Sequence, residues 1–126
     1  DRDSYDEELL AKHPDLVRFT DRAVRADPAG VAQQAVDAIS ATAGSVVVHF
    51  DVDAVDSGDL PLADFPNYGA GVSLAAAGEV LRTLYSVPGL AAIVLTEVNP
   101  THDADSSQLD RYIATVSSAM SGLAHS

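Results

Sequence analysis

An apolar run that passes directly into a series of aspartates constrains this chain more than any other stretch. Residues 45–56 read SVVVHFDVDAVD, so the valines lead to carboxylates at Asp51, Asp53 and Asp56. Side chains alternate faces along a strand, and His49, Asp51 and Asp53 are therefore expected to point the same way. Bringing such groups together at a buried strand end costs free energy unless they have a partner. A divalent metal ion is the partner that we expect first.

The composition narrows the possible partners of the chain. Its 126 residues suit one domain with a modest core. The formal net charge of −12 argues against nucleic acid, because phosphates require Lys and Arg as partners, and it suits metal ions, a cationic substrate or simply solubility. No apolar segment reaches the length of a membrane span. The absence of cysteine excludes disulfides and thiolate chemistry, which fits a cytoplasmic protein.

Predicted strands and helices alternate along the chain. After a short helix at 5–12, we predict strands at 16–20, 45–52 and 90–96, each followed by a helix. The second and third strands are apolar on both faces, which is typical of central strands in a parallel sheet. The alternation predicts an α/β fold, with a parallel sheet flanked by helices in three layers. Ligands of such sheets bind outside the carboxyl ends of the strands.

Local capping signals define the helices. Asp27 followed by Pro28 is a typical helix start, and Ser73 is a second N-cap. Asp105 or Ser106 is expected to cap the last helix. The buried stripe of that last helix is expected to consist of Leu109, Ile113, Val116, Met120 and Leu123.

Carboxylates follow both of the predicted central strands. Asp51 and Asp53 end one strand, and Glu97 ends the other. Carboxylate oxygens suit Mg²⁺, Mn²⁺ or Ca²⁺, and an added imidazole suits Mn, Zn or Fe. The alternative is an acidic α/β domain in which these acids only cap loops and accept backbone N–H bonds.

The long segment 53–71 between these strands is rich in Pro and Gly. A loop of this length within a compact domain is usually functional or disordered. Its apolar side chains favour an ordered and functional loop; they are Leu60, Leu62, Phe65 and Tyr68. Phe65 and Tyr68 are expected either to line a substrate pocket or to anchor the loop.

The motifs resemble one known family. HFDVDAVD, then a Pro- and Gly-rich loop, then TEVNP is similar to the second half of the ureohydrolases, which include arginase, agmatinase and formiminoglutamase. The opening DRDSYDEE resembles their RDxDxxE segment. The resemblance covers nearly all of the chain. It implies that residues 1–126 form the C-terminal half of an arginase-like α/β domain.

The resemblance also implies a site and a reaction. The family carries a binuclear manganese centre, in which Asp51 matches an aspartate that bridges both ions and Asp53 one that binds a single ion. Glu97 matches the acid that holds the guanidinium or amidine group of the substrate. The implied activity is metal-dependent hydrolysis of a guanidino, amidino or formimino C–N bond, by a water that the two ions activate.

This chain departs from the family pattern in ways that matter for activity. The upstream His, the DAHxD motif and the proton-transfer His of the family are absent, so we expect an N-terminal half to supply them and the isolated chain to be inactive. Ser57 replaces the Pro of DxxDP, and residues 64–71 replace a GTPxxGG-like run. These changes leave the identity of the substrate undetermined. They also leave a non-catalytic, arginase-like binding module as the alternative function.

Three residues are expected to support the metal and substrate groups from nearby, namely His49, Asp56 and His102. Spacing alone would also allow His49 to be a third ligand, whereas the family pattern favours a supporting or packing role. His102 with Asp103 is expected either to face the mouth of the site or to lie in solvent. Because a half sheet leaves an edge exposed, the isolated chain is expected to form a homo-oligomer.

Overall fold

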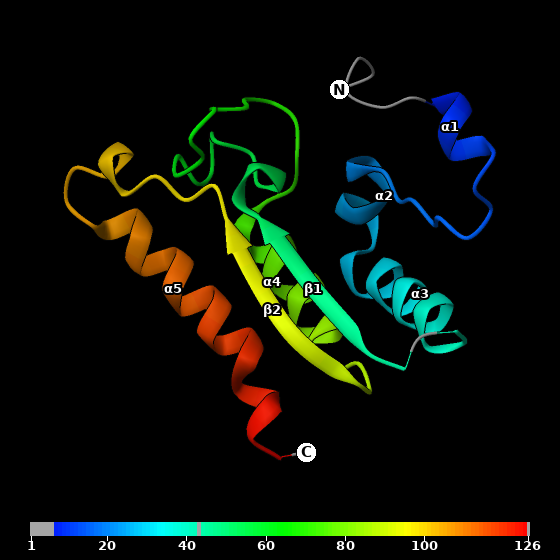
Figure 1. The fold of residues 1–126 in the computed structure, drawn as a ribbon. Helices are drawn as coiled ribbons and strands as arrows, with labels where there is room; N and C mark the ends of the chain where they lie inside the picture. Colours follow the sequence, from blue (N-terminus) through cyan, green and yellow to red (C-terminus); the bar gives the residue numbers. More distant parts are fainter. Residues whose placement is uncertain (1–6, 43, 126) are drawn as a thin grey trace.

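The computed structural model describes residues 7–42 and 44–125, and most of the opening DRDSYDEE therefore lies outside the described residues. Figure 1 shows helices packed beside a small sheet. In chain order the main elements are α1 (Glu7–Ala11), α2 (Asp21–Ala26), α3 (Pro28–Ser40), β1 (Val46–Asp51), α4 (Leu74–Leu84), β2 (Leu90–Thr96) and α5 (Ser107–Met120). Short 3₁₀ turns are η2 (Val52–Ala54), η3 (Pro100–His102) and η4 (Ser121–His125). The short N-terminal helix is thus confirmed over Glu7–Ala11.

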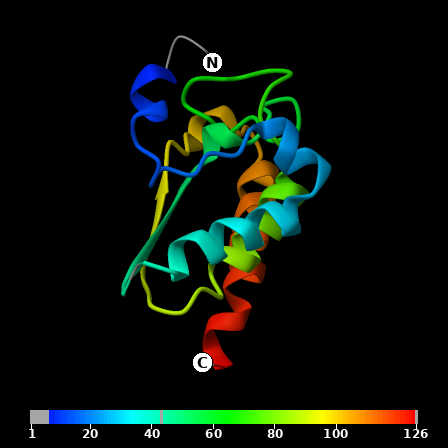
Figure 2. The same cartoon turned by 90° about the vertical axis from the view of Figure 1, so that its right-hand side faces the viewer.

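The two strands are parallel and are joined through α4, so the predicted α/β class with a parallel sheet is confirmed. Their register pairs His49 with Val94 and Asp51 with Thr96. Helices α4 and α5 lie on one face of the sheet (Figures 1 and 2). On that face the ring of Phe50 stacks on Tyr112 of α5, with ring centroids 6.1 Å apart. This contact joins β1 to α5 in the core.

The opposite face of the sheet carries no helix among the described residues, which form two of the three expected layers (Figure 2). Val47 of β1 is 61% exposed and Val94 of β2 is 41% exposed. Within the described parts of the chain, each strand pairs on one side only. The prediction that both strands are central is therefore wrong for the described residues, although their apolar side chains on both faces remain typical of buried strands.

The predicted strand at 16–20 is wrong. Residues 16–20 are irregular, and Leu16 and Val17 are exposed. Thr20 instead begins a helix that the prediction missed, because its Oγ1 accepts a hydrogen bond from the N–H of Ala23 at 3.2 Å. An apolar run this short stays irregular because no strand among the described residues pairs with it.

The caps predicted for the next two helices are confirmed. Asp27 accepts the N–H of Gly30 at 2.9 Å at the start of α3, with Pro28 in the first turn. Ser73 accepts the N–H of Ala76 at 3.1 Å at the start of α4. Helices α3 and α4 pack against one another, and α4 lies behind the two strands in the view of Figure 1.

The start of α5 differs in detail from the prediction. Ser106 occupies the N-cap position, but in a left-handed conformation and without a side-chain cap bond. Asp105 accepts the N–H of Ser107 at 3.0 Å instead. Within the predicted buried stripe, Ile113 is wrong, since it is 51% exposed. The adjacent Tyr112 takes the buried place because its ring fits against Phe50.

Candidate functional site

Strand β1 ends at Asp51, and the chain then turns through η2, which contains Asp53. An oxygen of the Asp51 carboxylate accepts the N–H of Asp53 at 2.9 Å. The alternation that was expected to place both aspartates on one strand face therefore stops at Asp51. The 3₁₀ turn still brings the two carboxylates together, because the first one caps the turn that carries the second.

The Asp53 carboxylate carries the clearest sign of an absent partner. Its Oδ1 is buried and accepts no hydrogen bond from the described residues. Burial raises the pKa of Asp53 above its usual value, and the nearby carboxylates of Asp51 and Asp64 raise it further. A cation placed here would supply the absent partner and offset all three effects. The donor set of Asp51 and Asp53 therefore fits a hard divalent ion.

Two carboxylates are too few for a complete metal site. Among the residues that the structure describes, no three His, Cys, Asp or Glu side chains converge as a metal would require. Asp51 and Asp53 consequently fit a metal only as part of a larger ligand set.

Glu97 lies at the same edge of the sheet as the two aspartates. It directly follows Thr96, which is the register partner of Asp51. Its backbone is left-handed, with φ of 63°, which is uncommon and costly for a residue with a side chain. Its carbonyl accepts the N–H of Asp64 from the long loop at 3.1 Å, while the residue itself is exposed. The carboxylate is thus accessible to a ligand that approaches the strand ends.

The long loop is ordered by acids that bind backbone N–H groups. Asp56 accepts the N–H of Gly58 at 2.8 Å and that of Gly69 at 3.2 Å. Gly71 must be glycine, because its φ is 83° and a Cβ there would lie 2.6 Å from the carbonyl of Ala54. The loop-capping alternative therefore describes Asp56, whose carboxylate supports the loop.

A second clamp on the loop was missed by sequence reasoning. Asp59 accepts the N–H of Leu74, at the start of α4, at 2.7 Å and the guanidinium of Arg111 of α5 at 2.9 Å. The Leu74 N–H and the Arg111 guanidinium hold the pKa of Asp59 below its usual value. Because 52 residues separate Asp59 from Arg111, no local pattern could have indicated the pair.

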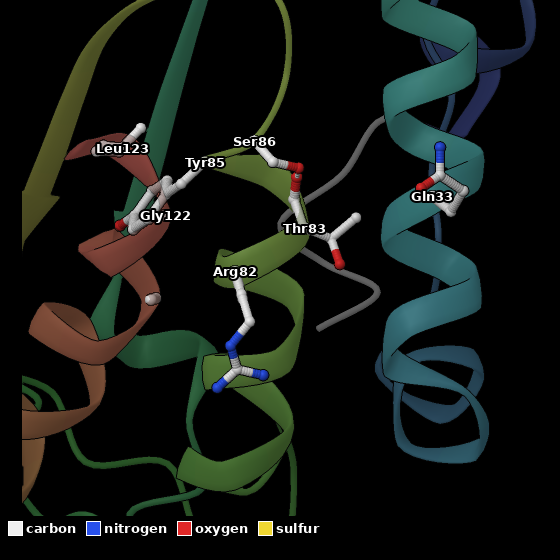
Figure 3. A pocket seen from close by; sticks show the side chains of 8 residues that line it. Gln33, Arg82, Thr83, Tyr85, Ser86, Gly122 and Leu123 are labelled. Atoms are coloured by element: carbon white, nitrogen blue, oxygen red, sulfur yellow. Dashed lines mark hydrogen bonds between the residues drawn. The ribbon is translucent and has the colours of Figure 1, made fainter. Parts of the chain in front are cut away.

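A cavity of about 330 Å³ lies elsewhere and belongs to no part of this arrangement. Figure 3 shows Arg82 of α4, Tyr85 directly after that helix, Gln33 of α3 and Leu123 of η4 around it. These residues sit near the C-terminal end of α4, which leads into the start of β2. The cavity is therefore at the end of the sheet opposite Asp51.

The chain matches a known family almost from end to end. Residues 1–122 match the model of the arginase family. The chain belongs to the arginase family. None of the helices within the described ranges has the length and apolar character that crossing a membrane requires.

Solved structures of arginases share the fold. The Bacillus caldovelox arginase is similar with a TM-score of 0.76 and 19% identity, over 91% of this chain and 38% of that one. The Bacillus subtilis arginase gives 0.76 and 22%, over 93% and 41%. A Trypanosoma cruzi formiminoglutamase solved with Mn²⁺ gives 0.60 and 24%, over 76% and 32%. The chain thus spans about two-fifths or less of these relatives, and no curated protein matches it.

The two histidines that were expected to support the site, His49 and His102, both contact residues near the strand ends. His49 is exposed on the sheet face of Asp51, and its Nε2 lies 2.7 Å from the hydroxyl of Thr96. His102 contacts the long loop through the carbonyl of Ala63, at 2.9 Å. Both histidines therefore lie beside the strand ends. Neither is part of a group of three metal ligands among the described residues.

The aromatic residues of the loop do not anchor it. Phe65 and Tyr68 are both largely exposed, whereas Leu60 and Leu62 are completely buried. The two leucines are the anchors, and the two aromatic side chains remain available to a ligand or to another part of the protein.

Proposed function

We propose that this chain supplies part of the active site of a metal-dependent hydrolase that cleaves a guanidino, amidino or formimino C–N bond. The observation that carries the proposal is the buried, unpartnered Oδ1 of Asp53 beside the carboxylate of Asp51. It lies just after the end of β1, in the segment whose resemblance to the arginase family implies metal ligands.

Asp51 and Asp53 would hold manganese together with ligands from outside this chain. Manganese, when bound, would supply an activated water as the nucleophile. Within the chain, Asp51 fixes the turn that aims Asp53, since its carboxylate caps the Asp53 N–H. A bound cation would stabilise the desolvated Asp53 carboxylate, and it would compete with a proton for the same oxygens.

Glu97 would bind the cationic part of the substrate. A planar guanidinium or amidinium matches a carboxylate with two parallel hydrogen bonds, which fixes both its orientation and its distance. Its exposure and its position after β2 support this role, because Glu97 would then accept such bonds beside Asp51 and Asp53.

The remaining ligands are proposed to come from a segment that completes the sheet. The chain spans 38% of the length of the Bacillus caldovelox arginase. The exposed apolar side chains of Val47 and Val94 lie on a bare sheet face, as expected of strands that another layer covers. The isolated chain would accordingly bind metal weakly and show no turnover.

The test is an assay of the complete protein with added Mn²⁺. Release of urea, ammonia or formamide is measured with arginine, agmatine, guanidinobutyrate and formiminoglutamate as substrates. We expect turnover of at least one, and its loss in the Asp53→Asn variant. If no substrate is hydrolysed while calorimetry shows Mn²⁺ bound, the chain belongs to a non-catalytic, metal-binding module. If neither turnover nor Mn²⁺ binding is found, the proposal fails.

The binding-module alternative has one observation in its favour. The loop residues 64–71 depart from the family pattern, and this is the loop that faces the strand ends. A changed loop could serve a different substrate or none, and the assay above separates the two cases.

A further inference from the structure

The turn after β2 and the long loop are joined by a compact set of hydrogen bonds that no part of the proposed function uses. The N–H of Asn99 donates to the carbonyl of Leu62 at 2.7 Å, and the N–H of Asp64 donates to the carbonyl of Glu97 at 3.1 Å. The two backbone bonds form an antiparallel bridge between Ala63 and Val98. They hold the loop against the residues on both sides of that bridge, including Glu97.

The Asn99 side chain adds a second connection. Its Nδ2 donates to the Asp64 carboxylate at 2.8 Å, and its Oδ1 accepts both the N–H and the hydroxyl of Thr101, at 3.0 and 2.6 Å. The orientation of the amide is fixed, because a flipped amide would place its oxygen against a carboxylate and its NH₂ against an N–H. Asn99 therefore uses both ends of its amide.

His102 completes the arrangement from η3. Its Nδ1 lies 2.9 Å from the carbonyl of Ala63, and its Nε2 lies 3.3 Å from Nδ2 of Asn99. A carbonyl only accepts, so Nδ1 carries a proton. Nδ2 of Asn99 only donates, so Nε2 carries a lone pair. One tautomer of neutral imidazole satisfies both contacts.

Glu97 needs such support because of its backbone. Its left-handed φ of 63° is a conformation that persists only where the surroundings impose it. The contacts just described, from Asn99 and His102 to residues 62–64, lie directly beside this residue. We call this set the Asn99–His102 latch.

We propose that Asn99 and His102 are positioning residues, which hold Glu97 and the Asp64 segment of the loop in the arrangement that receives the substrate. His102 acts as the Nδ1–H tautomer, and neither residue touches the reacting atoms. The inference rests on the proposed function for the role of Glu97. The latch itself rests only on the contacts.

The latch is tested first without any activity measurement. ¹⁵N NMR of the histidine rings in this chain is expected to show His102 protonated at Nδ1 and unprotonated at Nε2 at neutral pH. Amide exchange at the N–H of Asp64 is expected to accelerate in His102→Ala and Asn99→Ala, and to be unchanged in His13→Ala, an exposed histidine outside the latch. An Nε2–H tautomer, or unchanged exchange in both variants, overturns the latch.

The positioning role is tested by kinetics of the complete protein. We expect His102→Ala and Asn99→Ala to raise KM for the guanidinium substrate about five- to tenfold with a smaller change in kcat, the size expected for loss of one or two hydrogen bonds. His102→Asn, which keeps a donor near Ala63, is expected to recover part of the loss. Equal loss of kcat in all variants, or no change in KM, overturns the role. If the wild type hydrolyses nothing, the proposed function has failed, and the NMR arm still decides the latch.

Discussion

Ser57 and Asn67 are joined by two hydrogen bonds that run in opposite directions across the long loop. The N–H of Ser57 donates to the carbonyl of Asn67 at 2.8 Å, and the N–H of Asn67 donates to the hydroxyl of Ser57 at 2.9 Å. Ser57 is 2% exposed, so neither bond is replaced by water if it is lost. The residue that departs from the DxxDP pattern is therefore the one that closes the altered loop.

Substitution of Ser57 by proline is expected to destabilise this chain, although proline is the residue that the family pattern has there. Ser57→Pro removes the N–H donor and the hydroxyl, and leaves the Asn67 groups unpaired. We expect the free energy of unfolding to fall by about 2–4 kcal/mol, measured by urea denaturation. Ser57→Ala keeps the N–H and should cost only about 1 kcal/mol. Equal stabilities of the proline variant and the wild type would show that the two bonds do not hold the loop.

The bonds that Asp59 accepts from Leu74 and Arg111 should make the free energy of unfolding depend on pH in the acid range. The folded-state pKa of Asp59 is lowered, so its contribution is present above the unfolded value near 3.8 and is lost as pH falls through the folded value. Below about pH 4, the free energy of unfolding should therefore fall less steeply in Asp59→Asn than in the wild type. At pH 7 the variant should be less stable by about 1 kcal/mol, because the pair is partly exposed.

The control for that experiment is Asp15→Asn, which changes an exposed carboxylate outside the clamp. It should leave both the stability and its pH dependence as in the wild type. An Arg111→Met variant should reproduce part of the Asp59→Asn effect, since the Leu74 N–H bond remains. Parallel pH profiles for the wild type and Asp59→Asn would refute the assignment.

The bare face of the sheet should drive association of the isolated chain. We expect light scattering to find dimers or larger species, because an open strand edge next to exposed apolar side chains invites pairing. Val47→Lys should shift the chain toward monomer with a change in stability within about 0.5 kcal/mol, since Val47 is 61% exposed. Val17→Lys, also exposed but away from the sheet, should leave association unchanged. A monodisperse wild-type monomer would contradict the prediction.

The sequence could predict the features that depend on residues close together along the chain. The caps at Asp27 and Ser73 depend on side chains three residues from their N–H partners, and both were found. The edge shared by Asp51 and Glu97 followed from the rule that parallel strands end together. The strand predicted at 16–20 failed because five residues cannot reveal whether a partner strand exists.

Contacts between distant segments were beyond prediction for a physical reason. His102 lies 39 residues from Ala63, and the latch depends on how the loop folds back over the turn. Asp53 was predicted to be a metal ligand from its place in the motif, and that prediction still awaits a test. The expectation that Asp51 and Asp53 share one strand face was wrong, because the carboxylate of Asp51 caps a 3₁₀ turn. This turn ends the strand earlier than the apolar pattern indicates.

Two neighbouring acids should respond to the same substitution with opposite signs. In the metal-free chain at pH 7, Asp53→Asn removes a desolvated charge that the carboxylates of Asp51 and Asp64 repel, so stability should rise by about 0.5–1 kcal/mol. Asp56→Asn weakens bonds to the N–H groups of Gly58 and Gly69, so stability should fall by about 1 kcal/mol.

Urea denaturation of both variants with and without Mn²⁺ makes the contrast specific to a metal ligand. In the complete protein, Mn²⁺ should stabilise the wild type and Asp56→Asn, but should stabilise Asp53→Asn much less, because bound metal stabilises the folded state only through its affinity. A loss of stability in metal-free Asp53→Asn would mean that its carboxylate makes a favourable contact. The unpartnered Oδ1 would then no longer support the assignment of Asp53 as a metal ligand. A ligand without its metal is expected to destabilise the fold through its unpaired charge, whereas a loop cap stabilises the fold.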